Sequence, residues 1–248
     1  MVEEISVVII IKNGEKTIAN TLEAIQDFDD VVIYDNGSTD KTLAIVNKYP
    51  NVNLVQGDFS GFGPTKNKAA THAQFDWILS LDADEVVDKE FLNSLKIAKL
   101  NRQTVYQIFR KNFYQNTHIK HCWSNDKITR LYHRKRTQFD NKKVHEKVLA
   151  KGLKVELLTG FVDHYPYANI SDFIKKVDVY SSEFAYGNIG KRASSPVKAV
   201  LNSGFSFFKT YFLKRGFLDG YAGLVIAFSH MATNFYKYIK LYELNKKK

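Results

Sequence analysis

The sequence contains little cysteine and no hydrophobic run long enough to cross a membrane. Its single cysteine, Cys122, excludes an internal disulfide and a multi-cysteine metal site, and it fits a reducing compartment. The longest uncharged stretch, residues 220–236, is shorter than the roughly 20 residues that a spanning helix needs. The amino-terminal segment is acidic before its first apolar run and lacks a small-residue cleavage site, so no signal peptide is expected.

Glycine-rich phosphate-binding loops are also missing, and acidic residues are scarce late in the chain. Neither GxxxxGK[ST] nor GxGxxG follows the first apolar run, which disfavours P-loop nucleotidases and dinucleotide-dependent dehydrogenases. The 248 residues carry a net charge of +10, but residues 1–100 hold 9 basic and 16 acidic side chains, whereas residues 191–248 hold 11 and 2. The acidic first hundred residues disfavour a protein that coats nucleic acid along its whole length.

The first ninety residues show a regular alternation of strand and helix patterns. Apolar, largely β-branched runs predict strands at 5–11, 31–34, 52–55 and 77–81. Helical spacing or a capping residue predicts a helix between each pair of strands. Short, fully apolar strands that alternate with helices predict an α/β fold with a mostly parallel sheet flanked by helices.

Beyond residue 100 the pattern changes. Further strands are predicted at 104–109, 128–133 and 155–158, consistent with a mixed extension of the sheet, and from Ile170 onward the pattern is helical and aromatic. We therefore predict a catalytic domain at 1–190, with a donor and metal half at 1–100 and an acceptor half at 101–190. A basic, aromatic helical extension is predicted at 191–248.

Small, polar or acidic residues follow each of the first four predicted strands. Ligands of open parallel sheets bind at the carboxyl ends of the strands, where the loops share one edge. Turns are often rich in Asp, Asn and Gly for conformational reasons alone. Because all four strand ends are polar, a binding site is favoured over four unrelated turns. These strand-end segments are 13–15, 35–38, 56–58 and 82–85.

Asp82 and Asp84 form the sharpest element of this edge. Two carboxylates at i and i+2 just after a buried strand can reach one divalent cation, directly and through water, and Mg²⁺ or Mn²⁺ keeps coordination positions open for phosphate oxygens. The alternative is a solvated turn before the next helix, for which Asp88 alone would suffice as a cap.

Four motifs in order resemble those of glycosyltransferase family 2, which has the GT-A fold: residues 6–13, 32–42, 66–69 and 81–85. The resemblance implies a nucleotide-sugar donor. It implies that Asp35 accepts a hydrogen bond from the nucleobase and that Asn13 and Glu15 line the nucleoside pocket. It also implies that Lys66 and Asn67 hold the donor, that Asn36 belongs to the same substrate-binding set, and that Asp82 and Asp84 bind the diphosphate through Mn²⁺ or Mg²⁺.

Later segments resemble the subgroup that contains bacterial lipopolysaccharide-core β-glucosyltransferases. The matching parts are Trp123 and residues 127–132, 144–148, 164–167 and 211–223. This resemblance implies a UDP-linked donor, transfer of glucose with inversion at the anomeric carbon, and a lipopolysaccharide-core or other lipid-linked acceptor.

Three residues of the second half are predicted to join the site. Glu146 is the expected general base, flanked by lysines that could hold acidic substrate groups; Glu85 is its rival, and a surface Glu paired with lysines is the alternative. His164 is a candidate metal ligand or a simple hydrogen-bonding partner. Arg130 could meet a phosphate or acidic acceptor, or form a structural ion pair.

The carboxy-terminal segment combines Phe and Tyr with Lys and Arg and has almost no acids. This pattern is typical of an in-plane membrane helix, and it favours a peripheral position on the inner face of the cytoplasmic membrane. Packing on the catalytic domain or on a second subunit is the alternative. Two other functional classes stay open: a sugar nucleotidyltransferase, and a non-catalytic module that binds nucleotide sugars.

Overall fold

The computed structural model describes residues 2–124, 126–142 and 146–247, and the chain forms two compact units. The first, called the sheet unit, comprises Met1–Lys111 and Asn125–His164. The second, called the helical unit, comprises Asn112–Ser124 and Tyr165–Lys248. The predicted division into residues 1–190 and 191–248 stays a prediction.

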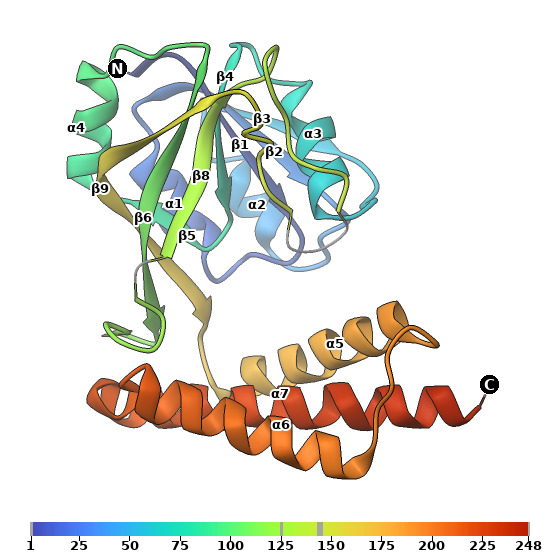
Figure 1. The fold of residues 1–248 in the computed structure, drawn as a ribbon. Coiled ribbons are helices and arrows are strands. Elements are labelled where there is room, and N and C mark those ends of the chain that lie inside the picture. The colour runs from blue at the N-terminus through green and yellow to red at the C-terminus, as the bar shows by residue number, and fades with distance from the viewer. Residues whose placement is uncertain (1, 125, 143–145, 248) are drawn as a thin grey trace. The chain divides into compact units, whose positions relative to one another are not determined.

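A nine-stranded mixed sheet, drawn in Figure 1, has the order β3-β2-β1-β4-β8-β6-β9-β5, with β7 paired to β6. Strands β1 to β4 are parallel, and β8 joins β4 in the antiparallel sense. The predicted α/β fold with a mixed extension is therefore confirmed. The strands are β1 Val2–Ile11, β2 Phe28–Asp35, β3 Val52–Gln56, β4 Trp77–Asp82, β5 Glu85–Val87, β6 Thr104–Tyr114, β7 Thr117–His118, β8 Asp126–His133 and β9 Lys154–Tyr167.

Helices cover both faces of the parallel strands. The odd residues of β1, such as Val7 and Ile9, lie in one buried cluster with side chains of α1, α2 and α4, whereas Val8 and Ile10 lie in a second cluster with alanines of α3. A strand buried on both faces reads as a continuous apolar run, which explains the sequence of β1. These helices are α1 Ile18–Ala24, α2 Thr42–Val46, α3 Phe62–Ala70 and α4 Lys89–Ile97.

The helical unit is built from α5 Ile170–Asn188, α6 Pro196–Phe208 and α7 Gly220–Lys246, and α7 packs against both α5 and α6. Asn169 caps α5 in a capping box with Asp172, and Ser195 caps α6, so both helices begin where side chains satisfy their first N–H groups. A π-helical turn, Lys209–Leu213, and a 3₁₀ turn, Gly216–Asp219, join α6 to α7.

Asp219 connects α7 to the loop that precedes β8. Its carboxylate accepts hydrogen bonds from the backbone N–H groups of Lys120, His121 and Cys122, at 2.9 to 3.2 Å. Within the described ranges, none of the helices is long and apolar enough to cross a bilayer.

Candidate active site

The loops that follow β1 and β2 are joined by hydrogen bonds into one rim. Asn13 has a positive φ of 56°, a conformation that asparagine tolerates. Its backbone N–H donates to Ser38 Oγ at 2.9 Å, and its Oδ1 accepts from the N–H of Thr39 at 2.8 Å. Glu15 Oε2 accepts from the N–H of Lys41 at 3.0 Å. The structure therefore brings Asn13 and Glu15 together with the loop after β2, and their predicted contact with a nucleoside stays a prediction.

Asp35 and Asn36 stabilise the same rim. Asp35 is fully buried, and its carboxylate accepts from the N–H of Gly37 at 3.0 Å and from the N–H and hydroxyl of Ser38. Asn36 Nδ2 donates to the carbonyl of Gly57 at 2.9 Å, which connects the loop after β3. Three strand ends thus form one preorganised edge. The nucleobase role of Asp35 and the substrate role of Asn36 stay predictions.

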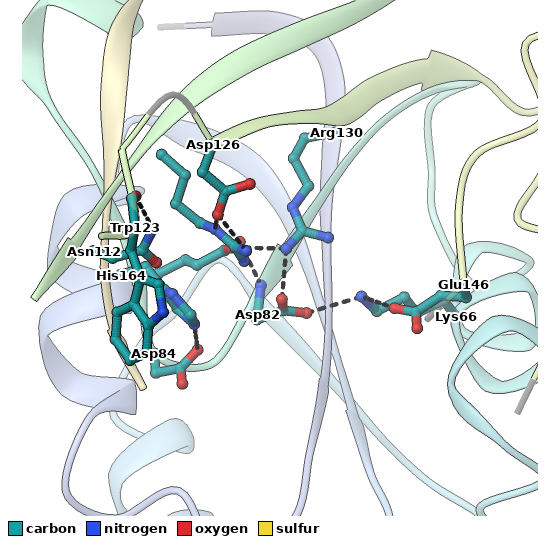
Figure 2. Close-up of polar contacts among 11 residues, drawn as sticks. Lys66, Asp82, Asp84, Asn112, Trp123, Asp126, Arg130, Glu146 and His164 are labelled. Atoms are coloured by element: carbon teal, nitrogen blue, oxygen red, sulfur yellow. Dashed lines mark hydrogen bonds and ion pairs between the residues drawn. The ribbon is translucent and has the colours of Figure 1, made fainter. Parts of the chain in front are cut away.

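At the end of β4, three of the predicted residues form a line of ion pairs, which Figure 2 shows. Lys66, which is buried on α3, donates to Asp82 Oδ1 at 2.8 Å and to Glu146 Oε1 at 2.8 Å. The structure therefore brings Lys66, Asp82 and Glu146 together although they lie up to 80 residues apart in sequence. Lys143, Val144 and His145, from the motif around Glu146, lie outside the described residues.

The line continues into the sheet through two arginines. Arg130 of β8 donates to Asp82 Oδ2 at 2.5 Å and to Glu85 Oε1 at 2.7 Å. Glu85 is fully buried and also pairs with Arg110 at 3.1 Å, and Arg110 pairs with Asp126 at 2.7 Å. Four carboxylates and three cations thus alternate from Glu146 to Asp126.

Arg110 and Asp126 have no place among the residues that the sequence predicts for the site. They are register partners in the antiparallel pair of β6 and β8. A cross-strand pair of opposite charge is a common stabilising element of sheets. The register that joins the two residues depends on the long connection between the strands, which carries no turn signature that could have indicated it.

The environment of Asp82 keeps its carboxylate ionised. Burial alone would raise the pKa of this carboxyl, but the charges of Arg130 and Lys66 outweigh that effect and hold the pKa well below its ordinary value of 3.8. The side chain of Asp82 remains 32% exposed and so reaches the surface, whereas the side chain of Glu85 is fully buried. Asp82 therefore offers a fixed negative charge at the mouth of the site.

Asp84 and His164 form the best candidate for holding a metal. Strand β5 pairs with β9 so that Glu85 faces His164, and Asp84 Oδ1 lies 3.7 Å from His164 Nε2. A carboxylate oxygen and an imidazole nitrogen at this separation fit one Mn²⁺ ion as two protein ligands, with other positions open to diphosphate and water. Among the residues that the structure describes, no group of three or more His, Cys, Asp or Glu side chains gathers to hold a metal.

Asp82 contacts Lys66 and Arg130, whereas Asp84 lies beside His164. The predicted set of three metal ligands stays a prediction in full.

Asn67 has a structural contact that its motif did not indicate. Its Nδ2 donates to the carbonyl of Phe139 and its Oδ1 accepts from the N–H of Phe139, both at 2.9 Å. The amide of Asn67 thus bonds both the N–H and the C=O of Phe139, as the backbone of a neighbouring strand would. Phe139 is in turn bridged to Val148, so Asn67 holds one end of the segment that carries Glu146.

The chain has an α/β fold with a polar edge formed by the loops after its strands and a charged cluster after β4. Folds of this class bind ligands at the carboxyl ends of their parallel strands. The family model described as glycosyl transferase family 2 matches residues 6–153. The chain belongs to this family and is a glycosyltransferase with the GT-A architecture.

The chain is similar to several known proteins. An uncharacterized glycosyltransferase of Rickettsia bellii is 30% identical over 261 residues, covering 99% of this chain and 88% of the relative. The lipopolysaccharide core biosynthesis glycosyltransferase LpsC of Rhizobium meliloti is 26% identical over 246 residues, covering 90% and 89%. The structure of S. aureus TarS 1–349 in complex with UDP is 18% identical with a TM-score of 0.48, covering 98% and 90%.

Proposed function

We propose that this glycosyltransferase is a metal-dependent, inverting hexosyltransferase that moves glucose from a UDP-linked donor to a lipopolysaccharide-core or other lipid-linked glycan. The observation that carries the proposal is the line of contacts from Glu146 through Lys66 to Asp82, beside the pair of Asp84 and His164. It combines an acceptor-activating carboxylate, a donor-side cation and candidate metal ligands. The similarity to LpsC supports the class of acceptor.

Glu146 is the proposed general base. Lys66 holds its Oε1 at 2.8 Å, and among the described side chains and backbone groups none bonds to Oε2. Oε2 can therefore take the proton of the acceptor hydroxyl while that oxygen attacks the anomeric carbon and the nucleoside diphosphate leaves from the opposite face. Direct displacement of this kind inverts the anomeric configuration. Glu85 is a weaker candidate, because Arg130 and Arg110 both bind its Oε1 and it has no exposed surface.

Lys66 and the metal ligands are proposed to act on the donor. A divalent cation bound by Asp84 and His164 would supply positive charge for the departing diphosphate. Lys66 orients both carboxylates that it contacts, so it fixes the base relative to the end of β4. Arg130 binds two carboxylates of the protein at 6% exposure, and this supports the structural ion pair over a contact with substrate.

Release of nucleoside diphosphate from a panel of nucleotide sugars, with and without Mn²⁺, tests the proposal. We expect the largest release with UDP-glucose, Mn²⁺ and a lipopolysaccharide-core acceptor. Glu146→Gln should lower the turnover by at least about 100-fold while leaving donor binding intact. Glu156→Gln, an exposed change on β9, is the matched control and should leave turnover unchanged. Turnover of Glu146→Gln near that of the control would refute the assignment of the base.

The same assay separates the alternatives. A sugar nucleotidyltransferase would consume a nucleoside triphosphate and a sugar phosphate and release pyrophosphate. A non-catalytic module would bind nucleotide sugars without releasing any product. Either result would refute the proposed reaction.

Membrane association is the second part of the proposal, and it depends on α6 and the π-turn. Their apolar side chains recur at helical spacing and are 48 to 68% exposed. Basic residues flank this face at both ends, and each can contribute about 1 kcal/mol near an anionic membrane. The protein is therefore proposed to bind the inner face of the cytoplasmic membrane peripherally. The apolar residues are Val197, Val200, Leu201, Phe205, Phe208, Phe212 and Leu213, and the basic ones are Lys191, Arg192, Lys214 and Arg215.

Sedimentation with anionic vesicles tests this part. The double variant Leu201→Gln/Phe205→Gln should lose at least about tenfold in vesicle binding, because each change removes one exposed apolar side chain that would insert into the membrane. Ile97→Gln removes an apolar side chain that is 82% exposed in the sheet unit and should bind as the wild type does. Equal binding by all three proteins would contradict the membrane role of α6.

A further inference from the structure

The helical unit contains a cavity of about 340 Å³ that lies entirely within its own residues. Helices α5, α6 and α7, the π-turn and Trp123 form its walls. Its volume falls in the range of about 300 to 1,000 Å³ that is typical of small-molecule sites. It is therefore large enough for a ligand.

Positive charge dominates the wall of this cavity. Four lysines line it, Lys176, Lys209, Lys214 and Lys237, and within the described part of the chain no Asp or Glu does. No carboxylate pairs with Lys209, Lys214 or Lys237 among the described residues. Burial lowers the pKa of Lys237, so a bound anion would offset the loss of hydration at that ammonium group.

Three of the five acids of the helical unit have partners outside the cavity. The unit has 14 Lys and Arg against 5 Asp and Glu. Asp172 completes the capping box of α5, Asp178 pairs with Lys240 at 2.7 Å, and Asp219 holds three backbone N–H groups. None of these three carboxylates lines the cavity.

The remainder of the wall is aromatic and hydrogen bonding. Trp123 and Tyr167 stack at 5.8 Å with 24° between their planes, and both line the cavity. Thr210 Oγ1 lies 3.0 Å from His230 Nδ1, and Asn234 Nδ2 donates to Ser206 Oγ at 2.9 Å. Burial, together with nearby lysines, lowers the pKa of His230 to about 4, so its imidazole is neutral and can bind a hydroxyl group.

The backbone at this wall departs from a regular helix. Residues Lys209–Leu213 form a π-helical turn, and Lys209, Thr210 and Lys214 line the cavity from this turn or directly after it. Turns of this kind often occur at functional sites, because they bring side chains to positions that a regular α-helix would not reach.

We infer that this cavity is a binding site for a sugar that carries a phosphate group, with the lysines on the phosphate and the aromatic and hydroxyl groups on the ring. The inference rests on the proposed function, because a phosphorylated glycan acceptor is what would bring such a sugar to this enzyme. A bare phosphate would leave the aromatic wall unused, and a lipid headgroup without a ring would do the same. The cavity therefore selects acceptors by their charge and their ring together.

Titration calorimetry on the full chain tests the site without any catalytic turnover. Glucose 6-phosphate is the probe, and glucose, inorganic phosphate and glycerol 3-phosphate are the comparisons. We expect glucose 6-phosphate to bind at least about tenfold more tightly than each of the other three. The double variant Lys209→Gln/Lys214→Gln should weaken its binding by about 100-fold, since two charge-assisted contacts are lost.

The matched control is Lys175→Gln/Lys191→Gln, which removes the same charge from exposed lysines outside the cavity. It should bind glucose 6-phosphate as the wild type does. Equal loss in both double variants would overturn the site, because the effect would then be one of net charge. Equal affinity for glycerol 3-phosphate or inorganic phosphate would overturn the role of the ring.

Failure of the proposed function is distinguishable from failure of this site. Lys209→Gln/Lys214→Gln should still release nucleoside diphosphate from the donor in the absence of acceptor, at the wild-type rate. If the wild type releases none from any nucleotide sugar but binds glucose 6-phosphate selectively, the reaction is refuted and the phosphosugar site stands. If it turns over donor but shows no preference for glucose 6-phosphate, the site alone is refuted.

Discussion

Replacing Arg130 with methionine should destabilise the sheet unit by about 3 kcal/mol, because the change removes the cation between two carboxylates. Arg130 is 6% exposed and binds Asp82 at 2.5 Å and Glu85 at 2.7 Å. Methionine fills much of the same space without charge, so the loss is electrostatic rather than a cavity effect. Glu85 has no exposed surface and cannot recover the interaction from water.

The magnitude follows from what remains after the change. Breaking a buried ion pair by removal of one partner costs about 3 to 5 kcal/mol. The lower end applies here, because Glu85 keeps Arg110 at 3.1 Å and the N–H of Asp82 at 3.0 Å, and Asp82 keeps Lys66 at 2.8 Å. Arg130 Nε is also buried without a partner among the described groups, and its removal lifts that penalty.

Urea unfolding followed by tryptophan fluorescence can measure this loss. The chain has two tryptophans, Trp77 in the sheet unit and Trp123 in the helical unit, so a Trp123→Phe background leaves Trp77 as the reporter. Arg136→Met, at an exposed position, is the control and should change the free energy of unfolding by less than about 0.5 kcal/mol.

A double-mutant cycle with Glu85→Gln separates the ion pair from other effects. The double variant Arg130→Met/Glu85→Gln should be less destabilised than the sum of the single variants by about 2 kcal/mol, since no unpaired carboxylate remains at position 85. Additive single effects, or a loss in Arg130→Met no greater than in Arg136→Met, would refute the reasoning.

Three further predictions concern other parts of the molecule. The pKa of His230 is lowered to about 4 by burial and by Lys214 and Lys237, so the unfolded chain takes up a proton near 6.5 before the folded chain does; stability should fall by about 3 kcal/mol from pH 7 to pH 4, and unfolding of His230→Gln should lack this component. A Cβ at Gly223 would lie 1.8 Å from the carbonyl oxygen of Gly216, so Gly223→Ala should lower the free energy of unfolding by about 2 kcal/mol, whereas Gly204→Ala, with open space around it, should raise it by about 0.5 kcal/mol. Mn²⁺ binding in the presence of UDP, followed by electron paramagnetic resonance, should weaken at least about tenfold in Asp84→Asn and stay unchanged in Asp29→Asn, an exposed change near the start of β2.

The parallel half of the fold was predictable from sequence, because its inner strands β1, β2 and β4 are buried on both faces. The runs 5–11, 31–34 and 77–81 within these strands are apolar at nearly every position, and this pattern does not depend on distant contacts. Capping residues were equally local: Asp88 accepts from the N–H of Phe91 at 2.7 Å, and Pro196 occupies the first turn of α6.

The charged network could be predicted only in part, because its links depend on strand register. Asp82 and Glu146 were identified by their motifs, but Arg110 and Asp126 meet only through the pairing of β6 with β8. Asn67 illustrates the same limit. Its motif indicates a contact with the donor, and its observed hydrogen bonds go to the backbone of Phe139, a segment 72 residues away. No local pattern encodes such a partner.

The pairing of β5 with β9 has a consequence for the order in which the protein acquires its parts during synthesis. Glu85 and His164 are register partners 79 residues apart in the chain. At roughly 5 to 20 residues per second, a ribosome needs roughly 4 to 16 seconds to extend the chain from one to the other. During that interval the rim of loops after β1, β2 and β3 can already form, whereas Asp84 has no histidine beside it. The rim of loops can therefore be complete several seconds before His164 is available to pair with the segment around Asp84.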